Sequence, residues 1–300
     1  MFKKSSEEDY WRKWTIFLKF IKEKEIDFDN ITIDIVLRFF SYLFYSKGLK
    51  PSTIGHYRSA LAQPLLAYFN INLRVPEVNA MIRSMRLQRP HEPPPRPSWK
   101  LSKVLTLLDN LTIDSEKGSL KKTAFLLLLA TGWRLSELHA CVRDSEFCRF
   151  TEADTVILKP HSSFLAKNGL RKRLDAKEIK TLKLANGQTS NICPVTSLKQ
   201  YLEYTRNKVG CLFLNPKDGK SISMFQLRYH ICALITEADP DTRAKVHDIR
   251  KYAASCSFQQ DMLVGDLTED FNWSTPAIFY KYYFMQADIL EMPVALPVRK

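Results

Sequence analysis

The clearest structural signal in the sequence is T-A-F-L-L-L-L-A-T-G-W-R-L-S-E-L, at residues 123–138. The purely apolar run within it predicts a buried helix, because it is much shorter than the roughly 20 residues that span a bilayer. Gly132 is a typical helix stop, and a second helix is expected to begin near Leu135. Arg134 therefore lies in the break between two helices. Alone, an arginine at a helix start is more often a surface residue or an ion-pair partner than a functional group.

Downstream of this stretch, from about Cys148 to Leu184, apolar and polar residues alternate as they do in strands, and Asn186–Gly187 marks a turn. The stretch from Lys159 to Lys183 contains many basic residues and only two acidic ones, Asp175 and Glu178. A basic hairpin is usually a solvated face, but this density indicates contact with phosphates. The basic residues are Lys159, Lys167, Arg171, Lys172, Arg173, Lys177, Lys180 and Lys183.

Helical patterns return after Pro194 and continue into two further motifs. V-H-D-I-R at residues 246–250 puts His247 and Arg250 on one helical face, since residues three apart are neighbours on a helix. N-W-S-T-P-A-I-F-Y-K-Y-Y-F at residues 272–284 is rich in aromatic residues. A lone His-x-x-Arg is common, and aromatic residues that cluster are more often part of a hydrophobic core than of an active site. Neither motif is therefore specific alone.

The first half of the chain predicts short helices. Apolar residues recur at helical spacing from Trp11 and again from Ile33 until Gly48, and Pro51 suits the first turn of the next helix. Residues 90–97 then read P-H-E-P-P-P-R-P, which neither a helix nor a central strand tolerates. We therefore expect a helical domain at 1–88, a stiff linker at 89–98 and a second, α+β domain at 99–300. The alternative is a surface loop inside one domain. The expected fold class is mainly α with a small antiparallel β-sheet.

The composition indicates the partner. The formal net charge is +13 and the pI is about 9.4. This charge favours nucleic acid as the partner and, second, an anionic membrane surface. The alternative is a protein that is basic without a polyanionic partner. The six cysteines form no C-x-x-C pair, and no cluster of histidines has zinc spacing, so we expect free, buried thiols and no metal. The N-terminus has no apolar signal core, and we expect an intracellular protein without membrane contact.

Taken together and in this order, the motifs resemble those of the tyrosine recombinase/integrase family. That family has an arginine in A-T-G-x-R-x-x-E-L, a lysine on a β-hairpin, H-x-x-R, then His or Trp, and finally a nucleophilic tyrosine. The resemblance covers the whole chain, because S-T-I-G-H-Y-R-S-A-L at residues 52–61 is similar to the family's core-binding domain. T-G-W-R-L-S-E-L-H-A and W-S-T-P-A-I-F-Y-K-Y-Y look most similar to recombinases of eukaryotic mobile elements, the DIRS, Ngaro and Crypton-like groups.

The resemblance implies site-specific DNA recombination or integration, as in transposons, through a 3′-phosphotyrosine intermediate and without metal, ATP or another cofactor. Such a step adds charge to the phosphoryl oxygens, and two arginines can neutralise it by bidentate contacts that lysine does not match. This assigns the clamp to Arg134 and Arg250. His247 would accept or relay the tyrosine proton, and the Trp273 indole N–H would donate to the phosphate. Glu137, at the family's acidic position, would orient a nearby basic group.

Two assignments stay open at this point. Tyr282 lies nine residues after Trp273, the commonest family spacing, whereas Tyr283 fits the mobile-element pattern better. We favour Tyr283 as the nucleophile, with Tyr282 as the close alternative and Tyr280 as a packing residue. The general acid that protonates the leaving 5′-oxygen is expected to be a hairpin lysine; Lys167 resembles it most, and its rivals are Lys159 and Lys172.

The expected partner is double-stranded DNA, bound by a homo-oligomer, either a dimer or a tetramer, in the nucleus if the host is eukaryotic. Two other functions remain: a domesticated, non-catalytic DNA-binding protein, and a basic helical scaffold for acidic proteins. Residues outside the catalytic set are also expected to contact DNA. They are His56, Arg58, Arg86, Arg89, Arg171, Lys172 and Arg173.

Overall fold

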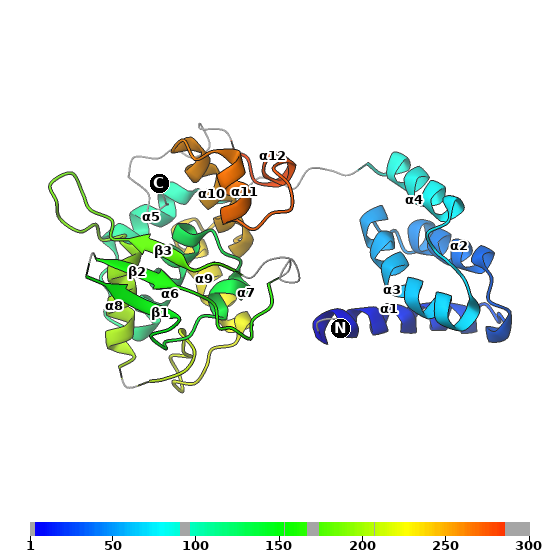
Figure 1. Cartoon of the computed structure of the whole chain (residues 1–300), viewed down its shortest axis with the longest axis horizontal. Coiled ribbons are helices and arrows are strands. Elements are labelled where there is room, and N and C mark those ends of the chain that lie inside the picture. Colours follow the sequence, from blue (N-terminus) through cyan, green and yellow to red (C-terminus); the bar gives the residue numbers. More distant parts are fainter. Residues whose placement is uncertain (1–3, 91–96, 153, 167–173, 207, 286–300) are drawn as a thin grey trace. The chain divides into compact units, whose positions relative to one another are not determined.

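The computed structural model describes residues 4–90, 97–152, 154–166, 174–206 and 208–285. The chain divides into two compact units, Met1–Glu92 and Pro93–Lys300, whose helices and strands are labelled in Figure 1. Each unit has its own hydrophobic core. Within the described ranges, no helix is long and apolar enough to cross a bilayer.

The first unit is built from helices in its described residues. Aromatic side chains fill its core; the rings of Phe17 and Phe39, both fully buried, meet at 5.1 Å between centroids. Gly48, with φ of 64°, follows the second of the predicted helices, as expected for a helix stop. The elements are α1 (Lys4–Glu23), η1 (Phe28–Asn30), α2 (Ile33–Ser41), the π-helical turn η2 (Tyr42–Ser46), α3 (Pro51–Phe69) and α4 (Pro76–Gln88).

Helix α3 carries the family-like segment of this unit. Pro51 occupies its first turn, where a missing N–H costs nothing, and Asn70 caps its end in the left-handed conformation. The predicted stripe of Ile54, Tyr57 and Leu61 is buried against the rest of the unit. The opposite side of α3 is consequently left exposed to solvent.

The second unit combines helices with one small sheet, which confirms the predicted fold class. Helices α10, α11 and α12 gather on one side of it in Figure 1. The helices are α5 (Leu101–Asn110), α6 (Glu116–Thr131), α7 (Leu135–His139), α8 (Pro194–Tyr204), α9 (Met224–Ala238), α10 (Val246–Gln259), α11 (Val264–Asp270) and α12 (Ala277–Tyr282). The strands are β1 (Cys148–Thr151), β2 (Thr155–Leu158) and β3 (Lys177–Lys180).

Helix α6 is the centre of this unit. It contains the apolar run that the sequence identified as core, and it is buried almost without interruption from Ser119 to Thr131. It packs against α8, α9 and α10. Gly132 ends it with φ of 61°, and α7 begins at Leu135, so Arg134 does lie in the break between two helices. The side chains around this break are therefore anchored to the most buried element of the unit.

The sheet is antiparallel in the order β1-β2-β3, with Val156 opposite both Phe150 and Ile179. It is smaller than the alternating pattern suggested. The segment S-F-L-A-K-N at residues 163–168 was predicted as strand, but residues 163–166 are turn and irregular chain, because the Phe164 N–H donates to His161 O at 2.9 Å instead of joining a ladder. Residues 167 and 168 lie outside the described residues. The expected turn at Gly187 is present, with φ of 81°.

Candidate active site

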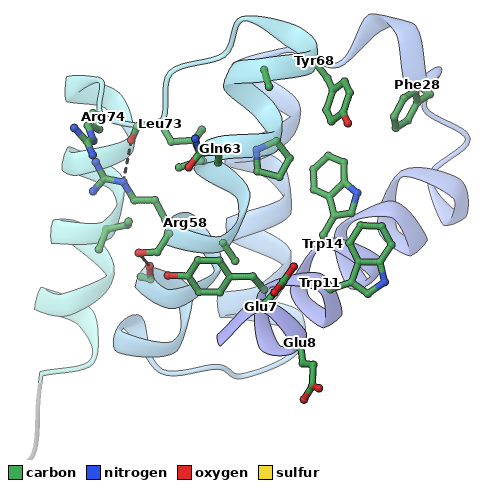
Figure 2. A pocket seen from close by; sticks show the side chains of 18 of the residues that line it. Glu7, Glu8, Trp11, Trp14, Phe28, Arg58, Gln63, Tyr68, Leu73 and Arg74 are labelled. Carbon is green, nitrogen blue, oxygen red and sulfur yellow. Dashed lines mark hydrogen bonds between the residues drawn. The ribbon is translucent and has the colours of Figure 1, made fainter. Parts of the chain in front are cut away.

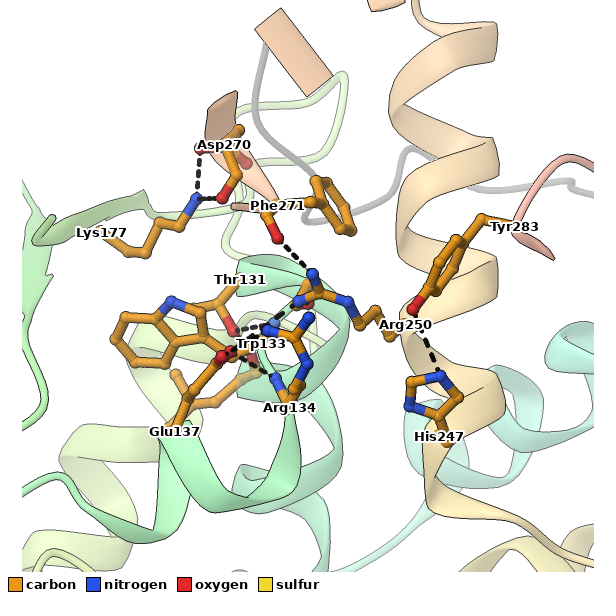
Figure 3. Close-up of polar contacts among 12 residues, drawn as sticks. Thr131, Trp133, Arg134, Glu137, Lys177, His247, Arg250, Asp270, Phe271 and Tyr283 are labelled. Atoms are coloured by element: carbon orange, nitrogen blue, oxygen red, sulfur yellow. Dashed lines mark hydrogen bonds and ion pairs between the residues drawn. The ribbon is translucent and has the colours of Figure 1, made fainter. Parts of the chain in front are cut away.

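The break between α6 and α7 holds the first arginine. Arg134 is the N-cap residue of α7, and its backbone N–H and its Nη1 each donate to a different oxygen of Glu137 at 2.7 Å. Glu137 is only 1% exposed, whereas the Arg134 side chain keeps 21% of its surface exposed. The buried carboxylate therefore fixes the arginine, whose side chain stays partly exposed (Figure 3).

Helix α10 supplies the second arginine. Arg250 is 2% exposed, and its two terminal nitrogens donate to the carbonyls of Gly132 and Phe271. Burial, followed by the positive charge of Arg134, lowers the pKa of Arg250 to about 10, so it stays charged at neutral pH. Its Nη1 also lies 3.8 Å from Glu137 Oε2. One carboxylate thus contacts both arginines.

Tyr283 lies directly after α12 and reaches the same place. Its side chain is 8% exposed, and its hydroxyl is 3.3 Å from His247 Nε2 (Figure 3). Its ring centroid lies 4.7 Å from that of Trp273 and 5.8 Å from the Arg250 guanidinium carbon. The hydroxyl, the imidazole and the buried guanidinium are therefore assembled within one chain.

The two neighbouring tyrosines point elsewhere. Tyr282 is 37% exposed, and its ring lies beside the Lys281 ammonium, 5.2 Å away. Tyr280 is 57% exposed and packs its ring near those of Phe258 and Phe284. Among the described tyrosines of this region, Tyr283 is the one beside His247.

His247 is suited to take up a proton near neutral pH. Desolvation first, and then the positive charge of Arg250, lowers the pKa of its imidazole below the ordinary value. His247 as a whole is an exposed residue, which moderates this effect. A neutral imidazole has one unprotonated nitrogen, which can accept the hydroxyl proton of Tyr283.

Trp273 completes the cluster with an unused donor. Its ring lies between Phe271 and Tyr283, with centroid distances of 4.9 and 4.7 Å. The Trp273 Nε1 and the Arg250 Nε are buried and have no hydrogen-bond partner in the described part of the chain. Buried N–H groups usually have partners, so two open donors near one tyrosine suggest that an acceptor binds there.

The hairpin lysine is not placed by these observations. Lys167, Arg171, Lys172 and Arg173 lie outside the described residues. Lys159, at the end of β2, is half-buried.

Lys177, one of the basic residues whose density indicated contact with phosphates, is buried in the second unit, which the sequence analysis did not predict. It is 4% exposed, and its Nζ donates to the carboxylate of Asp270 and, at 2.7 Å, to the carbonyl of Asp270. The signal was present, because the period of two along a strand puts Lys177 on the same face as Ile179. This contact joins β3 to the end of α11, directly before Phe271.

The first unit contains its own group of predicted residues. Arg58 and Arg86 line a hollow of about 1410 Å³, and Figure 2 shows Arg58 and Arg74 facing it from one side and Trp11 and Tyr68 from the other. Arg58 Nε donates to the Leu73 carbonyl at 2.9 Å, which holds its side chain along the wall.

The other two predicted residues of this unit lie outside the hollow. His56 is exposed on α3. Arg89 stacks its guanidinium 4.0 Å over the Phe44 ring, so part of it packs against the unit's own core.

Comparisons with known proteins agree with this geometry at the level of the fold. No protein-family model and no curated sequence matches the chain. Among solved structures, the Tn1549 transposon integrase in complex with transposon right end DNA is 14% identical; the match covers 96% of this chain and 92% of that one, with a TM-score of 0.62.

Two further structures are similar. The XerH site-specific recombinase bound to its palindromic difH substrate is 16% identical, with 93% and 75% covered and a TM-score of 0.60. A lambda integrase dimer bound to a COC′ core site is 12% identical, with 94% and 72% covered and a TM-score of 0.57. The chain therefore has the fold of tyrosine recombinases and integrases, as the sequence resemblance predicted.

Proposed function

We propose that this chain is a site-specific recombinase that cuts and rejoins double-stranded DNA through a covalent bond between Tyr283 and a 3′-phosphate. One observation carries the proposal: the Tyr283 hydroxyl lies 3.3 Å from His247 Nε2, beside the charged Arg250. A tyrosine hydroxyl is a weak nucleophile at its reference pKa of about 10, and a base within hydrogen-bond reach activates it.

The residues divide the chemistry among them. The Tyr283 oxygen attacks the phosphorus while its proton passes to His247, and the bond from phosphorus to the 5′-oxygen breaks. The 5′-oxygen takes a proton from a general acid, for which Lys167 stays our proposal. The phosphodiester energy is kept in the new bond, so rejoining needs no ATP.

Charge that develops on the phosphoryl oxygens needs fixed donors. Arg134 offers the guanidinium of a partly exposed side chain, and Arg250 and Trp273 offer the buried N–H groups that have no partner in the described residues. Arg250 is itself held by two carbonyls, so its position is set before DNA arrives. Donors that are already oriented cost no reorganisation during the reaction.

The first unit is proposed to bind the same DNA. Its exposed α3 side carries His56, and the hollow beside it is lined by Arg58, Arg74 and Arg86. The net charge of +13 supports a polyanionic partner. We also propose that the chain works as a dimer or tetramer on DNA and belongs to a mobile element, in the nucleus if the host is eukaryotic. Structures of lambda integrase, as a dimer and as a tetramer on a Holliday junction, and of the Tn1549 transposon integrase support this.

Covalent trapping tests the proposal. Duplexes enriched for binding from a random-sequence pool are nicked on the 3′ side of the cleavage point. The short fragment that carries the leaving 5′-hydroxyl then dissociates and cannot be rejoined, and the DNA-linked peptide is identified by mass spectrometry. We expect an adduct on Tyr283 that Tyr283→Phe abolishes and the matched Tyr282→Phe retains. The reverse result would assign the nucleophile to Tyr282.

Failure to form an adduct would contradict catalysis, and the salt dependence of binding then identifies the remaining function. Binding that weakens steeply with salt indicates a non-catalytic DNA-binding protein, because DNA contacts release counterions. Binding to acidic proteins without that dependence indicates a scaffold.

A further inference from the structure

The segment that carries Tyr283 has little local structure to hold it. Helix α12 spans only six residues, and such a short helix is not stable on its own. Phe279, which is fully buried, and Phe284 pack their rings against Phe258, at centroid distances of 5.1 and 5.9 Å. Apolar contacts of this kind are not directional, so they attach the helix to the unit without fixing the angle at which Tyr283 leaves it.

Ser255 supplies a directional contact at that point. It lies on α10, is 0% exposed, and its hydroxyl donates to the Tyr283 carbonyl at 2.7 Å. The same oxygen accepts the Met285 N–H at 3.0 Å. Both peptide groups lie just beyond the end of α12, where no further helical turn can pair them. One hydroxyl therefore holds both the Tyr283 carbonyl and the Met285 N–H.

We infer that Ser255 is a positioning residue that holds the Tyr283 hydroxyl where it can attack, an inference that rests on the proposed function. His247, Arg250 and Ser255 all belong to α10, so the bond ties the nucleophile to the helix that carries its base and one of its arginines. Misplacement of a reacting group by about 1 Å can cost about 100-fold in rate.

The simpler interpretation is that Ser255 only satisfies buried polar groups and stabilises the fold. That role predicts a lower unfolding temperature but a normal rate for molecules that are folded. Positioning predicts a slower covalent step at saturating DNA, at temperatures well below unfolding, with unchanged DNA affinity.

Ser257 provides the matched control. It is also a buried serine on α10, but its hydroxyl donates to Ala253 O at 3.0 Å, within its own helix. Ser255→Ala is expected to slow single-turnover adduct formation by about 10- to 100-fold, while Ser257→Ala keeps the wild-type rate. Ser255→Cys, whose thiol fills the site but bonds weakly, should also slow the step and serves if the alanine variant does not fold.

A second measurement needs neither DNA nor chemistry. Amide hydrogen exchange at Met285 should become faster in Ser255→Ala and stay unchanged in Ser257→Ala. If the wild type forms no adduct, the proposed function fails, and the exchange result then tests only whether Ser255 holds the backbone at Met285. Unchanged Met285 exchange, or an adduct rate in Ser255→Ala equal to that of Ser257→Ala, would overturn the inference.

Discussion

Gly132 offers the sharpest test of how the site is built. It has φ of 61°, and a Cβ added there would collide with the Phe271 ring. The left-handed conformation costs a residue with a side chain about 1–2 kcal/mol. Overpacking of a full core adds about 1–3 kcal/mol. Gly132→Ala should therefore lower the free energy of unfolding by about 2–5 kcal/mol.

Gly187→Ala is the control, because Gly187 also has a positive φ, of 81°, but has nothing within 4 Å of an added Cβ. It should cost only the backbone strain, about 1–2 kcal/mol, as measured by urea unfolding. The Phe271 carbonyl accepts from Arg250, so displacement of Phe271 should also slow adduct formation in Gly132→Ala alone. Equal losses of stability in the two variants, with equal adduct rates, would refute the reasoning.

The remaining predictions concern single groups of the site. Arg134→Lys and Arg250→Lys should lose adduct formation, because the point charge of lysine does not replace the planar guanidinium. Both variants should keep most of their DNA affinity in a gel-shift assay. Cleavage at the wild-type rate would show that these arginines do not clamp the phosphate. Adduct formation should fall as pH falls below about 6.5, since the neutral form of His247, whose pKa is lowered, is the one that accepts the proton; a rate that rises on acidification would contradict this. Lys177→Met should destabilise the protein by about 1–3 kcal/mol, because it removes a buried ammonium that donates to the Asp270 carboxylate and carbonyl. Lys180→Met, on the exposed face of β3, should stay within about 0.5 kcal/mol in thermal unfolding.

The parts of this fold that the sequence predicted are those set by local signals. A continuous apolar run followed by glycine specifies a buried helix and its end, so the position of Arg134 in the break could be predicted. His247 and Arg250 could be placed on one helix because three residues nearly complete a turn. The order of the motifs along the chain then sufficed for the fold.

The parts that could not be predicted depend on contacts between distant segments. The hydrogen bond from Ser255 to the Tyr283 carbonyl joins residues 28 positions apart, and no local sequence pattern predicts it. The choice between Tyr282 and Tyr283 depends on where α12 ends, which tertiary packing decides. Lys177 was grouped with the basic residues expected to contact phosphates, because its charge was given more weight than its alternation with Ile179.

The distribution of the site along the chain has a consequence for its synthesis. The first unit has a separate core, so it can fold once its own residues have left the ribosome. Tyr283 follows roughly 190 residues later, which at about 5–20 residues per second is a delay of about 10–40 s. Arg250 also cannot reach its final position until Phe271, whose carbonyl accepts its hydrogen bond, has been synthesised. With the proposed function, a growing chain would bind DNA long before it could cleave a strand, and interrupted translation would yield a DNA-binding chain that leaves DNA intact.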